Sequence, residues 1–186
     1  MKLYLVRHGE PDYTIPLMRG QIGMGVDMAP LSENGEKQAL EVSKDPRFKD
    51  AEVIISSPFT RALQTAAIIS KNTGLNIIVE NDLHEWSPDL TFKKKRINFG
   101  KIHDEMKKSN GKRRSIFQKW EEFDEIGKRA FACLEKYIGK YETVIVVAHG
   151  YVFNQFIFNP VMKNCEVEEY EFTKDSKPLG YIDPQP

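Results

Sequence analysis

The stretch Thr143-Val-Ile-Val-Val-Ala148-His149-Gly150 decides the fold. Its first six residues form a short run rich in β-branched side chains, which is typical of a strand buried on both faces of a parallel sheet. A histidine and a glycine follow directly, and the next apolar residues predict a helix to about Phe158 that Pro160 ends. A buried strand that turns into a helix is the unit from which parallel α/β sheets are built.

Similar runs recur on both sides of this stretch. Further strands are predicted at Lys2–Val6, Glu52–Ser56 and Asn76–Glu80, and Val167–Phe172 alternates like an edge strand. One helix is predicted from Ser32 to about Lys44. A second begins with Ser57 as N-cap and Pro58 at the first helical position and ends at Gly74, and a third follows an apolar stripe from Ile116 to Ile138. Strands that alternate with helices predict one α/β domain over residues 1–186 with a mostly parallel central sheet.

The composition limits the classes of function. The 186 residues fit one domain, and 27 basic against 27 acidic residues give no net charge, which argues against a generic nucleic-acid binder. Hydrophobic residues make up 40% of the chain, enough for a core. Cys133 and Cys165 are too few for a disulfide scaffold, and no apolar run approaches the ~18 residues of a membrane span. The first residues do not form a signal peptide, so we expect a cytoplasmic protein with no nucleic-acid or membrane partner.

Residues 86–114 break the pattern and predict an irregular basic insert of short helices and loops. Ten basic residues lie between Lys93 and Arg114, opposed by Asp104 and Glu105, which gives the segment a net charge of +8. A solvated face and a lid over an anionic substrate are both consistent with this charge. An RNA-binding patch is less favoured, because only Phe92 and Phe99 could stack on bases.

Chemically active side chains follow four of the predicted strands. The pair Arg7-His8 ends the first strand, Arg61 lies in the first turn of the helix after the second, and Glu85 and His149 follow the third and fourth. Ligands of parallel α/β sheets bind beyond the carboxyl ends of the strands. We therefore expect these five side chains to meet at one site.

This set describes an anion site that contains a nucleophile. A neutral His8 imidazole can attack phosphorus and form a phosphohistidine, while Arg7 and Arg61 bind the phosphoryl oxygens. A protonated His149 would stabilise charge on these oxygens, and Glu85 could protonate the leaving oxygen and later deprotonate water. The arginines supply the positive charge, so we expect neither a metal nor another cofactor.

Four motifs resemble those of the histidine phosphatase superfamily, the phosphoglycerate-mutase-like family, in its cytoplasmic branch. They are Arg7-His8-Gly9-Glu10, Ser57-Pro58-Phe59-Thr60-Arg61-Ala62-Leu63-Gln64-Thr65-Ala66, Leu83-His84-Glu85 and Ala148-His149-Gly150. The resemblance implies a three-layer α/β/α sandwich, a phosphorylated His8, a phosphate pocket of Arg7, Arg61 and His149, and Glu85 as proton donor. Residues 86–114 fall at the family's variable specificity insert, which favours the lid and a substrate with more than one negative charge.

The chain departs from the family pattern at two places. Family members commonly have Thr after the Glu and an Asn a few residues on, where this chain has Pro11-Asp12-Tyr13-Thr14. The phosphate contact of that Asn would fall to Thr14, Arg19 or Gln21. The segment Trp86-Ser87-Pro88-Asp89 replaces the frequent Gly-x-Trp-Glu-Gly pattern, which leaves Asp82 and Asp89 as alternative acids.

Three functions stay open at this point. We expect first a metal-independent phosphomonoesterase that acts on a small phosphorylated metabolite or a phosphoprotein. A phosphoglycerate-type mutase shares every catalytic residue, but this chain is short for the family's mutases. A non-catalytic module that binds phospho-ligands or phosphoproteins would explain the departures, yet it has no use for a nucleophile. The sequence leaves open the substrate and whether the protein forms a homodimer.

Overall fold

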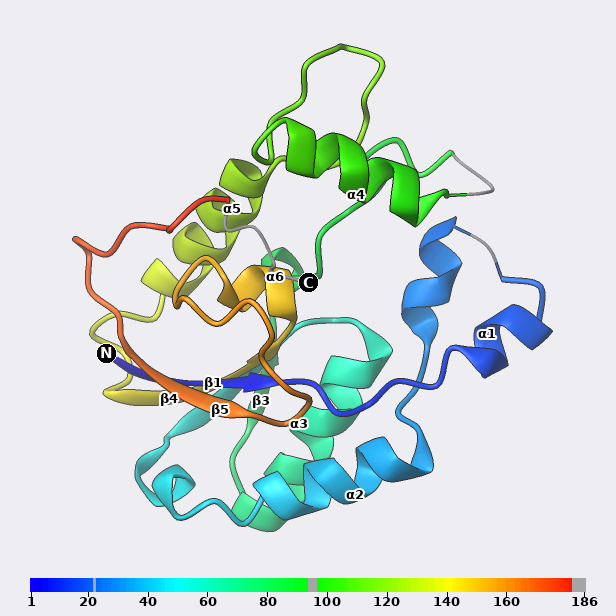
Figure 1. Ribbon diagram of the computed structural model, residues 1–186. Helices are drawn as coiled ribbons and strands as arrows, with labels where there is room; N and C mark the ends of the chain where they lie inside the picture. The colour runs from blue at the N-terminus through cyan, green and yellow to red at the C-terminus, as the bar shows by residue number, and fades with distance from the viewer. Residues whose placement is uncertain (22, 94–96, 182–186) are drawn as a thin grey trace.

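A computed structural model describes residues 1–21, 23–93 and 97–181 (Figure 1). Lys94, Lys95 and Arg96, three basic residues of the predicted insert, lie outside the described residues. In chain order the elements are β1 (Lys2–Arg7), α1 (Thr14–Met18), η1 (Gly23–Met28), α2 (Glu33–Val42), η2 (Pro46–Asp50), β2 (Val53–Ser56), α3 (Thr60–Thr73), β3 (Ile77–Val79), η3 (Asn81–Leu83), α4 (Phe99–Lys108), α5 (Phe123–Glu135), β4 (Thr143–Ala148), α6 (Gly150–Phe153) and β5 (Val167–Glu171), where η marks a 3-10 helix.

The five strands form one sheet in the order β3-β2-β4-β1-β5. The pairs β3-β2, β2-β4 and β4-β1 are parallel, and β5 runs antiparallel to β1 at the edge. The predicted mostly parallel sheet and its late edge strand are therefore confirmed. The strand Thr143–Ala148 has the predicted bounds and lies at the centre of the sheet, with the side chains of residues 144–148 fully buried.

Side chains of the central strands alternate between two cores, which makes the protein a three-layer α/β/α sandwich as predicted. Leu3, Leu5, Val144 and Val146 pack with the apolar residues of α5 and α6. Tyr4, Val6, Ile145 and Val147 pack with Ala62, Ala66 and Ile69 of α3. Figure 1 shows α2 and α3 on one side of the sheet and α5 and α6 on the other.

The turn after β1 packs tightly against the start of α2. Ser32, the N-cap, accepts a hydrogen bond from the backbone N–H of Gly35 at 3.0 Å and donates one to Glu10 Oε1 at 2.7 Å. A Cβ atom on Gly35 would lie only 2.1 Å from the carbonyl oxygen of Glu10, so this position requires a glycine. The close contact fixes the path of the chain just after His8.

The helix predicted along Ile116 to Ile138 begins only at Phe123. The residues before it take part in backbone pairing with the loop after η3: the N–H of Leu90 donates to the Lys119 carbonyl, and the N–H of Glu121 donates to the Ser87 carbonyl. Ile116 is accordingly 79% exposed and is no part of the buried stripe. The start of α5 is instead fixed by a capping box between residues 122 and 125.

Two other helix limits differ from the sequence expectation. The helix predicted from Ser57 starts at Thr60, with Phe59 rather than Ser57 as N-cap. The Ser57 Oγ accepts from the N–H of Phe59 at 3.3 Å and lies 2.7 Å from His149 Nε2. The helix predicted to run to Phe158 ends at Phe153, and the Gln155 carbonyl accepts from the N–H of Leu179 instead of continuing the helix. Tertiary contacts override local pattern in both cases.

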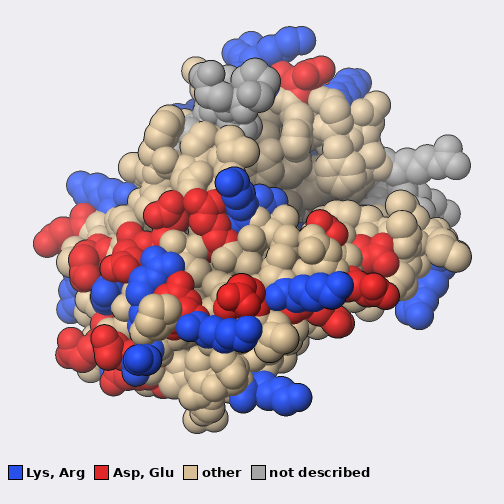
Figure 2. All heavy atoms as spheres, turned by 60° about the horizontal axis from the view of Figure 1, so that its bottom comes forward, with Lys and Arg blue, Asp and Glu red and all other residues tan. Residues whose placement is uncertain are grey.

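One face of the molecule agrees with the balanced composition. On the face formed by the underside of Figure 1, acidic and basic side chains are interspersed (Figure 2). No helix within the described residues is long and apolar enough to cross a membrane.

Candidate active site

The sheet register brings the predicted site residues together. Arg7 of β1 pairs with Ala148 of β4, and Ser56 of β2 pairs with Val147. His8, His149 and Ser57 therefore leave three adjacent parallel strands side by side. The N–H of His8 donates to the Ala148 carbonyl at 3.1 Å, which continues the ladder one residue into the site.

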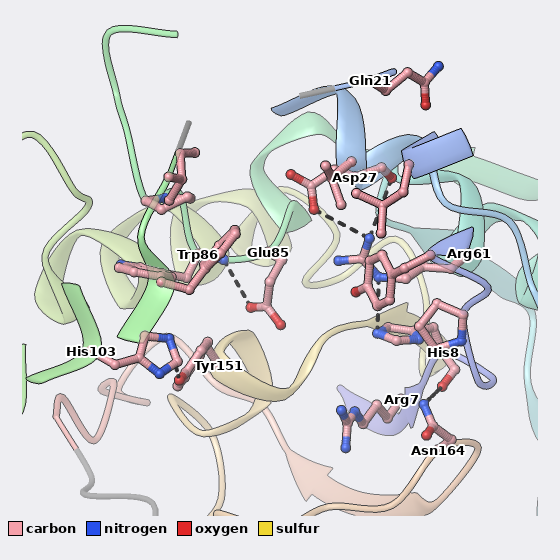
Figure 3. A pocket seen from close by; sticks show the side chains of 17 residues that line it. Arg7, His8, Gln21, Asp27, Arg61, Glu85, Trp86, His103, Tyr151 and Asn164 are labelled. Carbon is pink, nitrogen blue, oxygen red and sulfur yellow. Dashed lines mark hydrogen bonds and ion pairs between the residues drawn. The ribbon is translucent and has the colours of Figure 1, made fainter. Parts of the chain in front are cut away.

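A cavity of about 910 Å³ opens in front of these strand ends (Figure 3). Five of the side chains singled out from the sequence line it: Arg7, His8, Gln21, Arg61 and Glu85. Figure 3 shows Glu85 facing His8 and Arg7 across the cavity. Because these side chains come from four separate segments, the fold rather than local sequence assembles the site.

His8 is held as a neutral imidazole. Its side chain is buried, and its Nδ1 lies 2.7 Å from the Gly9 carbonyl oxygen, an acceptor, so Nδ1 carries the proton. Burial, with Arg61 and Arg7 nearby, lowers the pKa of His8 to about 3. Nε2 therefore keeps its lone pair at neutral pH, which is the state a nucleophile needs.

Arg61 lies beside that lone pair. Its Nε donates to His8 Nε2 at 3.2 Å, and its Nη1 lies 3.4 Å from both the Asp27 carbonyl oxygen and the carboxylate Oδ1. Burial raises the pKa of Asp27, although the Arg61 charge opposes this. A phosphoryl group that reaches Nε2 would displace the His8 contact, and its oxygens could then accept the donors of Arg61.

Arg7 approaches His8 from the side of the last loop. Its Nη1 donates to the Met162 carbonyl, while its buried Nε has no hydrogen-bond partner among the described residues. Asn164, from the same loop, donates to the His8 carbonyl at 2.8 Å. A buried guanidinium donor without a partner, at the wall of a cavity, suits an anion there.

His149 lies behind the cavity wall rather than on it. Its side chain is fully buried, its ring centroid is 5.1 Å from that of His8, and its Nε2 is 2.7 Å from Ser57 Oγ. Burial and Arg61 lower the pKa of His149 well below its usual range. His149 is therefore neutral in this environment, and the protonated form expected from the sequence would need the negative charge of a bound phosphoryl group beside it.

Glu85 has the environment of a proton donor. Burial raises the pKa of its carboxyl group, and the N–H of Trp86 donates to Oε1 at 2.9 Å. The loop that carries Glu85 is held by Arg129, which donates to the carbonyls of Asp82 at 2.5 Å and Glu85 at 3.4 Å. Arg129 is itself fixed by two contacts to the buried Glu121, at 2.6 and 3.0 Å.

The two alternative acids do not line the cavity. Asp89 is buried in its own turn, where its carboxylate accepts from Thr91 Oγ1 at 2.7 Å and from the Thr91 and Lys93 N–H groups. Asp82 offers its backbone carbonyl to Arg129. Of these three carboxylates, Glu85 is the one that lines the cavity.

The three residues predicted to replace the phosphate contact of the family's Asn lie in different places. Gln21 lines the cavity, whereas Thr14 and Arg19 do not. Thr14 forms a local turn, with Oγ1 2.5 Å from Asp12 Oδ1, and Arg19 is exposed at the end of α1.

The insert lies at the cavity, and none of the side chains that its described residues contribute to the wall is cationic. Ile97, Phe99 and His103 line the wall, while Lys101, Lys107 and Lys108 of α4 are exposed and lie outside the lining. The insert therefore borders the cavity through apolar and aromatic side chains, and its role as a lid stays a prediction.

Sequence reasoning missed most of the cavity wall. The residues it did not assign to the site are Pro11, Tyr13, Leu17, Val26, Asp27, Trp86, Pro88, Ile97, Phe99, His103, Tyr151 and Asn164. Among the described residues, no group of three or more His, Cys, Asp or Glu side chains is placed to hold a metal ion. The aromatic content of residues 86–103 was the one available signal.

Comparison with known proteins places these features in a family. A sequence profile described as the histidine phosphatase superfamily (branch 1) matches residues 3–175. A probable phosphoglycerate mutase of Photorhabdus laumondii is 30% identical over 73% of this chain, which spans 62% of that relative, less than two thirds of its length. An uncharacterised phosphatase of Bacillus subtilis is 30% identical over 78% of this chain and 70% of the relative.

A solved structure agrees with the fold. Bacillus stearothermophilus YhfR superposes with a TM-score of 0.71 at 21% identity, over 98% of this chain and 96% of that one. At this identity the likeness concerns the fold alone.

Proposed function

The chain belongs to the histidine phosphatase superfamily, and from this premise we propose that it is a metal-independent phosphomonoesterase that works through a phosphohistidine on His8. The observation that carries the proposal is the state of His8. Its Nδ1–H donates to the Gly9 carbonyl, and its unprotonated Nε2 lies at the cavity beside Arg61. A binding module gains nothing from a neutral, oriented imidazole at this position.

The first step transfers the phosphoryl group to the protein. Nε2 of His8 attacks phosphorus as the bond to the ester oxygen breaks, and Glu85 gives its proton to the departing alcohol. The Gly9 carbonyl stabilises the positive charge that develops at the ring through the Nδ1–H. Arg7 and Arg61 take the charge of the phosphoryl oxygens, which supports a reaction without a metal ion.

The second step returns the phosphoryl group to water. The Glu85 carboxylate takes a proton from a water molecule, the water oxygen attacks phosphorus, and the phosphorus–Nε2 bond breaks. Phosphate leaves, His8 is again neutral and Glu85 is again protonated, so the cycle consumes one ester and one water molecule. The raised pKa of Glu85 suits a group that must act as acid and then as base.

Trapping the intermediate tests the proposal. After rapid acid-free quenching of p-nitrophenyl phosphate turnover in EDTA, mass spectrometry should locate a phosphoryl group on His8. The His8→Asn variant should show neither the adduct nor turnover, whereas His103→Asn, which changes a histidine elsewhere on the same cavity wall, should keep the adduct. Turnover retained by His8→Asn would overturn the mechanism.

A mutase is the second candidate, because one relative carries that name. Incubation with 3-phosphoglycerate, followed by phosphorus NMR, separates the two reactions: isomerisation faster than phosphate release would favour the mutase. Phosphate binding without turnover of any ester would favour a binding module. A cytoplasmic location and the lack of nucleic-acid and membrane partners stay predictions of the sequence.

A further inference from the structure

The cavity is much larger than a phosphoryl group needs, and its two ends differ in character. One end holds Arg7, His8, Arg61 and Glu85, whereas the rest of the wall is mostly aromatic and aliphatic. Its volume of about 910 Å³ lies in the range of pockets that enclose a whole drug-sized ligand. The alcohol part of the ester therefore has a site of its own.

Charge argues against a second anionic group in that site. Among the described residues, the cationic side chains on the wall are Arg7 and Arg61, and both lie at the phosphoryl end beside His8. Asp27 and Glu85 add carboxyl groups to the same wall. Among these described side chains, a carboxylate or second phosphate on the substrate would be desolvated beside apolar groups and would meet no cation other than Arg7 and Arg61.

The far end of the cavity is an aromatic wall. The rings of Trp86, His103 and Tyr151 meet at centroid distances of 5.4 to 6.0 Å, and Phe123 packs behind Tyr151 at 5.2 Å. One polar pair interrupts this wall: Tyr151 Oη lies 3.4 Å from His103 Nε2. Burial lowers the pKa of His103, so the pair is uncharged at neutral pH. Such a wall suits a flat, apolar group.

The rim of the cavity is apolar as well. Leu17 of α1 and Phe99 of α4 line it, although their side chains are 61% and 47% exposed. Figure 1 shows both helices beyond the end of the sheet to which β1 points. A bulky apolar ligand would remove these exposed side chains from water, whereas a small polar one would not.

We propose that the substrate is the monophosphate ester of a bulky, uncharged alcohol with an aromatic or otherwise apolar body, which the wall of Trp86, His103 and Tyr151 and the rim of Leu17 and Phe99 enclose. The inference rests on the proposed phosphatase function and adds the class of its leaving group. It differs from the expectation, drawn from the basic insert, of a substrate with more than one negative charge.

Matched esters test the proposal. The esters 2-(1-naphthyl)ethyl phosphate and ethyl phosphate both release an unactivated primary alcohol, so they differ in the apolar body and not in leaving-group chemistry. Burial of one aromatic group predicts a kcat/KM at least about 100-fold higher for the naphthyl ester. Phosphoserine and 3-phosphoglycerate, which carry further charge, should be no better than ethyl phosphate. A preference for either charged ester overturns the proposal.

Rim variants give the second readout. The substitutions Leu17→Ser and Phe99→Ser should each raise KM for the naphthyl ester about tenfold and change ethyl phosphate hydrolysis much less. The control is Phe117→Ser, since Phe117 is 83% exposed and lies outside the cavity wall, and it should leave both reactions unchanged. Equal loss with both esters in the rim variants would refute the specificity role.

Binding of phosphonates separates this proposal from the proposed function. Calorimetry of the unmodified protein with 1-naphthylmethylphosphonate and methylphosphonate needs no turnover. Tighter binding of the naphthyl compound supports the aromatic subsite even if no phosphohistidine forms. Equal affinities, or no binding of either compound, overturn it even if the protein is a phosphatase.

Discussion

Replacement of Arg129 by methionine tests how the proposed acid is held in place. Arg129 does not line the cavity, yet it binds the carbonyls of Asp82 and Glu85 and forms a two-point ion pair with Glu121. The two side chains of that pair are only 13% and 5% exposed. Arg129→Met therefore leaves a buried carboxylate without its cation and frees two carbonyls of the acid loop.

The loss of stability expected for Arg129→Met follows from the burial of this ion pair. Removal of one partner of a buried ion pair destabilises a protein by about 3–5 kcal/mol. With an unfolding entropy of roughly 2.1 cal/mol/K per residue, a chain of 186 residues loses about 8–13 °C in melting temperature. The double variant Glu121→Gln, Arg129→Met should regain part of the lost stability, because it no longer holds the unpaired, buried carboxylate of Glu121.

The assay compares this pair with a less buried one of the same shape. Arg47 binds Asp45 through two contacts of 2.9 and 2.6 Å, and the two side chains are 37% and 15% exposed, so Arg47→Met should cost less than Arg129→Met. Urea unfolding followed by circular dichroism measures both. If Arg129→Met loses no more stability than Arg47→Met, the reasoning from burial is wrong.

A kinetic readout distinguishes positioning from stability alone. At a temperature where Arg129→Met is folded, kcat for an alkyl phosphate should fall while methylphosphonate affinity is kept, because only Glu85 has lost its support. Hydrolysis of p-nitrophenyl phosphate, whose leaving group needs little protonation, should fall less. An equal fall for both esters would argue against a displaced acid.

Three further outcomes follow from the geometry. Glu85→Gln should slow formation of the phosphoenzyme from alkyl phosphates by about 10²–10⁴-fold and from p-nitrophenyl phosphate much less, as measured by rapid quench; a uniform loss would contradict its role as acid. Because the pKa of His8 is about 3 in the folded protein and near 6.5 in the unfolded chain, the unfolded state binds more protons between these values. Stability in urea should therefore fall as pH drops from 6.5 toward 3, and His8→Ala should weaken that dependence. Gly35→Ala should lower the free energy of unfolding by about 1–3 kcal/mol in thermal unfolding, because the new Cβ would meet the Glu10 carbonyl oxygen. The control is Gly100→Ala in α4, where the nearest atom to a new Cβ lies at 3.7 Å, and it should be neutral or stabilising.

The strands and the meeting of Arg7, His8, Arg61 and Glu85 at one cavity could be predicted because their signals are local. An apolar run such as Thr143–Ala148 predicts a strand that is buried on both faces. A polar residue directly after such a strand then lies at the end of the sheet. Parallel register then aligns His8 with His149 without further information. The family resemblance and this physical argument lead to the same residues.

The features that sequence did not reveal depend on contacts between distant segments. Ser57 has the local pattern of an N-cap, but its hydroxyl hydrogen-bonds His149, 92 positions away. Trp120 fits a helical stripe, yet the residues around it pair with the loop after Glu85. The aromatic wall joins Trp86, His103 and Tyr151 from three segments, so no spacing in the sequence marks it.

The order of strands in the sheet also has a consequence for biosynthesis. In the part of the chain that the structure describes, β1 pairs with β4 and β5 alone, and β4 begins at Thr143. At usual rates of translation the ribosome adds the intervening residues on the order of ten seconds after β1 is made. Until then the segment that carries Arg7 and His8 has no neighbouring strand to pair with. The nascent protein therefore brings His8 beside His149 late, and the apolar segment Leu3–Val6 would be exposed to any factor that shields apolar chain on the ribosome.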